Sequence, residues 1–183
     1  NASGSIGSQT NKAKLDIVLV VDTSGSMDEK SSAQAKQSKL KDTKDAINAL
    51  VDVFANDDKK VDVQYKLVTF SSSSKIKTDK WVSGANLKKT VKDLDADGGT
   101  NYDKGLVNAA TAINSSRKGA RKIVIFLTDG KPTYYGDEKG YGNYTSKNTL
   151  DAAITSAGTI SCSDFYAVGI GLPGEKGVTV YTH

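Results

Sequence analysis

The strongest constraint on the fold is a pair of short, almost purely apolar runs rich in β-branched residues. Residues 15–21 read L-D-I-V-L-V-V and residues 123–127 read I-V-I-F-L, and turn-forming residues follow both runs. Runs of this length are typical of strands that are covered on both faces, as in parallel sheets. Segments with helical periodicity alternate with the strand-like ones. The chain therefore predicts an α/β fold, a doubly wound and mostly parallel sheet with helices on both faces.

Further segments complete this pattern. Residues 61–70 and 165–170 have strand character, and residues 178–181 could add a short strand. Ser31 and Gln34 fit a capping box, which predicts a long helix from there to about residue 55. Thr145 or Ser146 should cap a later helix whose inner face we expect to carry Leu150, Ala153, Ile154 and Ala157.

Composition narrows the possible functions. A length of 183 residues suits one domain, and we expect a flexible arm or non-native remnant at residues 1–12 and a single domain at residues 13–183. The absence of an 18-residue apolar run predicts no membrane span. The net charge is +4, but charges of both signs alternate without a basic tract, which argues against nucleic acid as a partner. With one cysteine, Cys162, and one histidine, His183, disulfide staples and histidine-based catalysis are not expected.

Polar residues follow the two most apolar strands. Asp22, Ser24 and Ser26 come after the first, Asp129 comes after the second, and Thr100 lies in a Gly-Gly-Thr-Asn loop before a predicted helix. In open α/β sheets, ligands bind at the carboxyl ends of the strands, so these three loops should converge. Their donors are all hard oxygens, which suit Mg²⁺, or Mn²⁺ or Ca²⁺, and do not suit zinc or copper.

Taken alone, the Asp22 segment could be an ordinary capping turn, and Thr100 could simply cap its helix. A Tyr/Gly-rich loop follows Asp129 and should lie on the same face. Tyrosine offers a large contact area with a polar tip at little entropic cost, so we expect this loop to contact a ligand. The alternative is a glycine-rich loop whose tyrosines pack on the neighbouring surface. The candidate ligand-binding residues are Tyr134, Tyr135, Tyr141 and Tyr144.

Asp-x-Ser-Gly-Ser, Gly-Gly-Thr and Thr-Asp-Gly, each in its predicted context, resemble the metal-ion-dependent adhesion site of von Willebrand factor type A domains. The resemblance covers about residues 15–172. It implies six strands with the third antiparallel at the edge, and a final helix that packs on the sheet. No amphipathic helix follows residue 170, so the resemblance leaves the carboxyl end either truncated or continued in a segment outside this chain. It also implies the metal ligands Asp22, Ser24, Ser26, Thr100 and Asp129.

Within that family, the low cysteine content and the Lys/Ser/Asn-rich surface resemble bacterial surface and pilus-tip adhesins. The resemblance implies a non-enzymatic module on the bacterial cell wall or pilus. It would use its cation to bind a carboxylate of a protein partner, such as a host extracellular-matrix protein.

Two alternatives remain open at this stage. An intracellular assembly module could use the same cation to bind a partner subunit. A Mg²⁺-dependent phosphohydrolase could use Asp22 as a nucleophile, but such enzymes place a second acid two residues later, where this chain has Ser24. The chain also has neither a phosphate-binding Gly-x-x-x-x-Gly-Lys loop nor a serine elbow.

Overall fold

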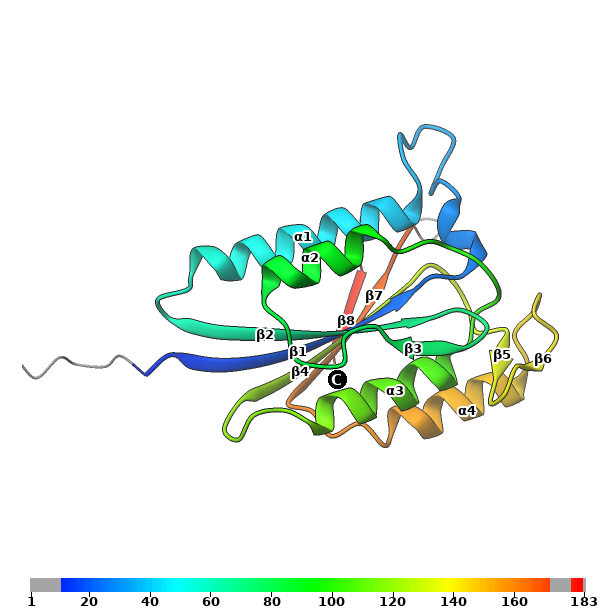
Figure 1. The fold of residues 1–183 in the computed structure, drawn as a ribbon. Helices are drawn as coiled ribbons and strands as arrows, with labels where there is room; N and C mark the ends of the chain where they lie inside the picture. Colours follow the sequence, from blue (N-terminus) through cyan, green and yellow to red (C-terminus); the bar gives the residue numbers. More distant parts are fainter. Residues whose placement is uncertain (1–10, 172–178, 183) are drawn as a thin grey trace, which may run out of the picture.

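The computed structural model describes residues 11–171 and 179–182, and its centre is a six-stranded sheet (Figure 1). The strand order is β3-β2-β1-β4-β7-β8. The four inner strands are parallel, and both edge strands are antiparallel to their neighbours. The strands are β1 (Ala13–Asp22), β2 (Val61–Phe70), β3 (Ser74–Ile76), β4 (Arg121–Thr128), β7 (Asp164–Gly169) and β8 (Thr179–Thr182).

Helices cover both faces of this sheet, with α1 and α2 on one side and α3 and α4 on the other (Figure 1). Within the described ranges, no helix has the length and apolar character needed to cross a membrane. A short 3-10 turn and a small hairpin, β5–β6, lie between the main elements. The remaining bounds are η1 (Gly25–Asp28), α1 (Lys39–Asn56), α2 (Gly84–Lys92), α3 (Tyr102–Asn114), β5 (Tyr134–Tyr135), β6 (Lys139–Gly140) and α4 (Lys147–Ala157).

The core has two layers because β1 is covered on both faces. Ile17 and Leu19 of β1 pack with α1 and α2, whereas Val18 and Val20 pack with α3 and α4. All four side chains are buried. The doubly wound sheet and its antiparallel third strand are confirmed, and so is the short strand near residue 180.

Two details of the sequence prediction were wrong. The first long helix begins at Lys39 with Ser38 as its cap, and Ser31 lies in an irregular segment before it. In α4, Leu150 and Ile154 are exposed instead of facing inward. The buried positions of α4 are Thr149, Ala153 and Ser156.

The prediction for the buried face of α4 was wrong for a physical reason. The hydroxyls of Thr149 and Ser156 can be buried there because both form hydrogen bonds. The Thr149 hydroxyl donates to the Ser146 carbonyl at 2.6 Å, and Ser156 donates to the Asp103 carboxylate. Small polar residues can therefore face α3 at close range. Ser146 caps α4 as predicted. Residues 1–10 of the predicted arm (residues 1–12), together with residues 172–178 and residue 183, lie outside the described residues.

Candidate metal centre

Three loops meet where β1 and β4 end. The Gly25 amide donates to the Gly98 carbonyl at 2.9 Å, which joins the first loop to the second. The Thr128 hydroxyl donates to Asp22 Oδ2 at 2.7 Å, which joins the first loop to the third. Thr133 completes the set, since its amide donates to the Thr100 carbonyl at 2.8 Å. The convergence that the sequence predicted is therefore present.

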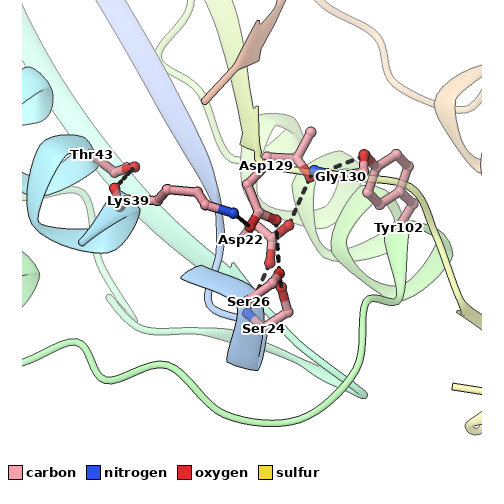
Figure 2. Close-up of polar contacts among 9 residues, drawn as sticks. Asp22, Ser24, Ser26, Lys39, Thr43, Tyr102, Asp129 and Gly130 are labelled. Atoms are coloured by element: carbon pink, nitrogen blue, oxygen red, sulfur yellow. Dashed lines mark hydrogen bonds and ion pairs between the residues drawn. The ribbon is translucent and has the colours of Figure 1, made fainter. Parts of the chain in front are cut away.

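Four of the five predicted ligands form a chain of hydrogen bonds (Figure 2). The Ser24 amide donates to Asp22 Oδ1 at 2.8 Å, and the Ser24 and Ser26 hydroxyls lie 3.2 Å apart. The Ser26 hydroxyl donates to Asp129 Oδ1 at 3.1 Å. A Cβ at Gly25 would lie in ordinary van der Waals contact with the Gly98 carbonyl oxygen, at 3.5 Å.

The fifth predicted ligand, Thr100, is held in place through its backbone. It is buried, its amide donates to the Thr133 hydroxyl oxygen at 3.0 Å, and its carbonyl accepts from the Tyr134 amide at 3.0 Å. Asn101 fixes the same loop from the other side. It is fully buried, and its side-chain amide donates to the Ser72 and Gly136 carbonyls at 2.9 and 3.0 Å. Thr100 thus lies on a tightly tethered loop, which the bond from the Gly25 amide to the Gly98 carbonyl joins to the loop of Ser24 and Ser26.

Asp22 is the unusual charge in this arrangement. It is completely buried, and burial raises its pKa to about 6 despite the hydrogen bonds it accepts from Ser24 and Thr128. None of the ion pairs formed within the described ranges involves Asp22. The negative charge of Asp129 raises the pKa of Asp22 further.

The other end of the same strand shows how this fold treats a buried carboxylate that has a structural role. Asp16 is also 0% exposed, but it is paired with Arg117. The Arg117 amide and Nε donate to its two oxygens at 2.6 and 2.9 Å. A buried carboxylate without such a partner is costly, and Asp22 has no such partner among the ion pairs of the described residues.

Two residues that sequence reasoning did not assign to the site also shape it. Lys39, the first residue of α1, places its Nζ 3.0 Å from Asp129 Oδ2 (Figure 2). Tyr102, at the start of α3, hydrogen bonds through its hydroxyl to the Thr128 hydroxyl at 3.0 Å and to the Gly130 carbonyl. Burial raises the pKa of Tyr102, so it acts as a neutral hydrogen-bonding group. The sequence signal that could have identified Lys39 is the helix cap at Ser38, which makes Lys39 the first residue of α1.

The donor set fits a hard divalent cation. Within residues 11–171 and 179–182, no group of three or more His, Cys, Asp or Glu side chains is placed to hold a metal ion. A site of the kind that zinc prefers is therefore not found in these ranges. Two carboxylates and neighbouring hydroxyls meet here instead, and such oxygens are the ligands that Mg²⁺, Mn²⁺ and Ca²⁺ prefer.

The tyrosines of the β5–β6 hairpin and of the loop that follows it divide into two groups. Tyr134 packs on the loop that carries Thr100, because a Cβ on Gly99 would lie 2.3 Å from its ring. Tyr141 and Tyr144 stack on each other with ring centroids 4.5 Å apart, and they are 67% and 50% exposed. With Tyr135 and the start of α4, they line an open cleft of about 610 Å³.

The fold and these loops define a doubly wound α/β module with a polar site at the carboxyl ends of its central strands. The model of the von Willebrand factor type A domain family matches residues 17–131, and the chain belongs to this family. No curated protein matches the sequence.

Solved structures with the same fold include two pilus proteins and one animal thread protein. The PilB minor pilin from Streptococcus sanguinis has a TM-score of 0.58 at 24% identity, over 66% of this chain and 31% of that one. The vWF domain of the type V pili tip protein Mfa5 from Porphyromonas gingivalis has a TM-score of 0.57 at 23% identity, over 68% and 40%. Proximal thread matrix protein 1 from the mussel byssus has 0.58 at 21%, over 86% and 38%. The chain thus spans less than half the length of each neighbour.

Proposed function

We propose that this domain is a cation-dependent binding module that attaches to an acidic group on a protein partner. The observation that carries the proposal is the fully buried Asp22 carboxylate, which no cationic side chain of the described residues neutralises. Asp22, Ser24, Ser26, Thr100 and Asp129 would hold Mg²⁺, or Mn²⁺ or Ca²⁺. When bound, such a cation supplies positive charge and a coordination position for an outside oxygen.

The charges of the site explain why the partner should be acidic. Asp22 and Asp129 provide two negative charges, and Lys39 neutralises one of them through its pairing with Asp129. Ser24 and Ser26 contribute neutral hydroxyl oxygens. The side chains therefore compensate a divalent cation incompletely, which favours a carboxylate from the partner as the next ligand.

The tyrosine cleft supports a protein as that partner. Tyr141 and Tyr144 present a stacked and exposed aromatic surface, and Tyr134 connects their hairpin to the Thr100 loop. Exposed aromatic side chains are common at the centres of protein interfaces. We propose that Tyr135, Tyr141 and Tyr144 contact the partner beside the carboxylate, with Tyr134 holding the hairpin in position.

The pilus proteins among the structural neighbours support a place on the bacterial cell surface. We infer an adhesive role there, with an acidic group of an extracellular-matrix or other protein as the ligand. We assign no catalysis to the site. Ser24 occupies the place where a phosphohydrolase would carry a second acid, and its hydroxyl lies 3.2 Å from the Ser26 hydroxyl. An assembly module inside the cell would use the same residues for a partner subunit.

The direct test is Mn²⁺ binding to the purified domain, measured by electron paramagnetic resonance and by calorimetry. The wild type should bind one ion, and Thr100→Ala and Asp22→Asn should each lower the affinity at least tenfold while keeping the circular dichroism spectrum. Asp95→Asn is the matched control, because it removes one negative charge at an exposed position. A folded Asp22→Asn protein that binds Mn²⁺ as tightly as the wild type would refute the proposal.

The second arm tests the partner. Binding of the domain to immobilised fibronectin and collagen should require Mg²⁺ or Mn²⁺ and disappear in EDTA. Tyr141→Ala should weaken this binding without changing the Mn²⁺ affinity, since the ring is exposed and stacks on Tyr144. Binding that persists in EDTA would contradict a cation-dependent mode.

A further inference from the structure

The Lys39–Asp129 pair is a second unusual feature of the site. The two side chains are 11% and 2% exposed, so the ion pair is almost completely withdrawn from water. Lys39 Nζ lies 3.0 Å from Asp129 Oδ2, while Asp129 Oδ1 accepts from Ser26 at 3.1 Å. One oxygen of Asp129 is thus occupied by a cationic side chain, and the other faces the serine hydroxyls (Figure 2).

The local structure places Lys39 there in spite of an electrostatic conflict. Lys39 is the first residue of α1, where the helix dipole disfavours a positive charge. Its backbone is fixed, because its amide donates to the Glu29 carbonyl at 2.8 Å and its carbonyl accepts from the Thr43 hydroxyl at 2.8 Å. Its stem passes close to Gly171, where a Cβ would lie 3.4 Å from Lys39 Cδ. A residue that breaks a local rule in this way points to a role in the site.

We infer that Lys39 is an affinity-determining residue, a tethered cation that lowers the affinity of the site for divalent ions. This inference rests on the proposed function. Without Lys39, Asp22 and Asp129 would present two negative charges to an incoming ion, and with Lys39 the side chains present one. When no metal is bound, the positive charge of Lys39 also offsets the repulsion between the two carboxylates. Lys39 therefore stabilises the metal-free fold.

A purely structural ion pair predicts a different pattern. In that case, removing Lys39 would lower stability by the same amount with and without a divalent ion, and the ion affinity would not rise. A tethered cation instead couples the two properties by linkage. The variant without it should be less stable in EDTA, bind Mn²⁺ more tightly, and recover more stability than the wild type when Mn²⁺ is added.

The experiment compares Lys39→Met, which keeps the length of the side chain but removes its charge, with Lys39→Arg, which keeps the charge. Lys41→Met is the matched control, since Lys41 lies on the same helix and is 55% exposed. Mn²⁺ affinity is measured by electron paramagnetic resonance, and melting temperature is measured in EDTA and in Mn²⁺. At the short distances of this site, loss of one positive charge should tighten Mn²⁺ binding roughly tenfold or more.

Lys39→Arg and Lys41→Met should bind Mn²⁺ within about threefold of the wild type, because the charge of the site is unchanged. If the wild type binds Mn²⁺ and Lys39→Met binds it no more tightly, the inference is overturned and the proposed function stands. If no variant and no wild-type protein binds Mn²⁺, the proposed function itself fails. Should Lys39→Met be unfolded in EDTA, titration with Mn²⁺ must refold it, and failure to do so also overturns the inference.

Discussion

Replacing Asp22 with asparagine should make the metal-free protein more stable at neutral pH. Asp22 is fully buried, and burial raises its pKa to about 6 from 3.8. At about 1.36 kcal/mol for each pKa unit, this difference corresponds to about 3 kcal/mol of lost stability once the carboxylate is ionised in both the folded and the unfolded state. Asparagine removes the charge and keeps the shape, so it should recover much of that loss.

The hydrogen bonds around Asp22 can accommodate the asparagine. The side-chain oxygen can still accept from the Ser24 amide, now at 2.8 Å from Oδ1. The new amide group can donate to the Thr128 hydroxyl, which lies 2.7 Å from Oδ2. The Thr128 hydroxyl can then donate to the Tyr102 hydroxyl, 3.0 Å away, where the present geometry already allows either direction. No buried polar atom of this network needs to lose its partner.

The pH dependence gives this prediction its sign. An acid whose folded pKa is raised binds its proton more tightly in the folded state, so the wild type loses stability as pH rises from 3.8 to about 6. The full loss is present above that window. Asp22→Asn lacks this loss, and its advantage should therefore be about 3 kcal/mol at pH 7.5 and shrink to about 1 kcal/mol at pH 4.5.

Urea denaturation in EDTA at these two pH values measures the effect. Asp95→Asn, an exposed change of the same charge, should differ from the wild type by less than about 0.5 kcal/mol at either pH. An Asp22→Asn protein that is less stable than the wild type at pH 7.5, or whose advantage is the same at pH 4.5, would refute the reasoning. In saturating Mg²⁺ the advantage should fall, because the wild type would bind the ion more tightly and gain more stability from it than the variant.

Three further predictions concern the scaffold. Arg117→Met should cost about 3 kcal/mol in urea denaturation, because it leaves Asp16 buried and unpaired; a loss below about 1 kcal/mol would contradict the contrast between the two ends of β1. Gly105→Ala should lower stability by about 1–3 kcal/mol although alanine favours helices, since its Cβ would lie 2.9 Å from the Phe70 ring; a higher melting temperature would show that this contact relaxes. Ile154→Ser should change stability by less than about 0.5 kcal/mol, because the side chain is 71% exposed, and a larger loss would restore the inward orientation that the sequence suggested.

The sequence predicted the sheet and the meeting of its loops because these depend on long, consistent signals. The β-branched runs of β1 and β4 leave few alternatives to buried parallel strands, and the carboxyl ends of such strands must share an edge. Lys39 could not be predicted in the same way. Its role depends on where α1 begins, and the Ser-rich segment before the helix offers Ser31 and Ser38 as competing caps.

The prediction of which face of α4 is buried was wrong for a related reason. Apolar periodicity assigns Leu150 and Ile154 to the core, but burial in α4 follows close packing and hydrogen bonding of small side chains. Single-sequence periodicity carries no information about Asp103, the distant residue that makes a buried Ser156 favourable. The position of Lys39 beside Asp129 and the burial of Ser156 beside Asp103 both depend on contacts between segments far apart in the chain.

The edge strands of the sheet limit how copies of this domain can associate edge to edge. On one side, β3 pairs with Val68–Phe70 of β2. Further along the chain, an isolated bridge from Val82 to Tyr65 pairs with one more residue of β2. Lys75 on β3 is exposed, which discourages another backbone from adding there. The opposite border is the four-residue β8. In a dense array, neighbouring copies would thus find only short strand edges at which to pair with each other. The end of each copy that carries the loops of the site could then stay accessible.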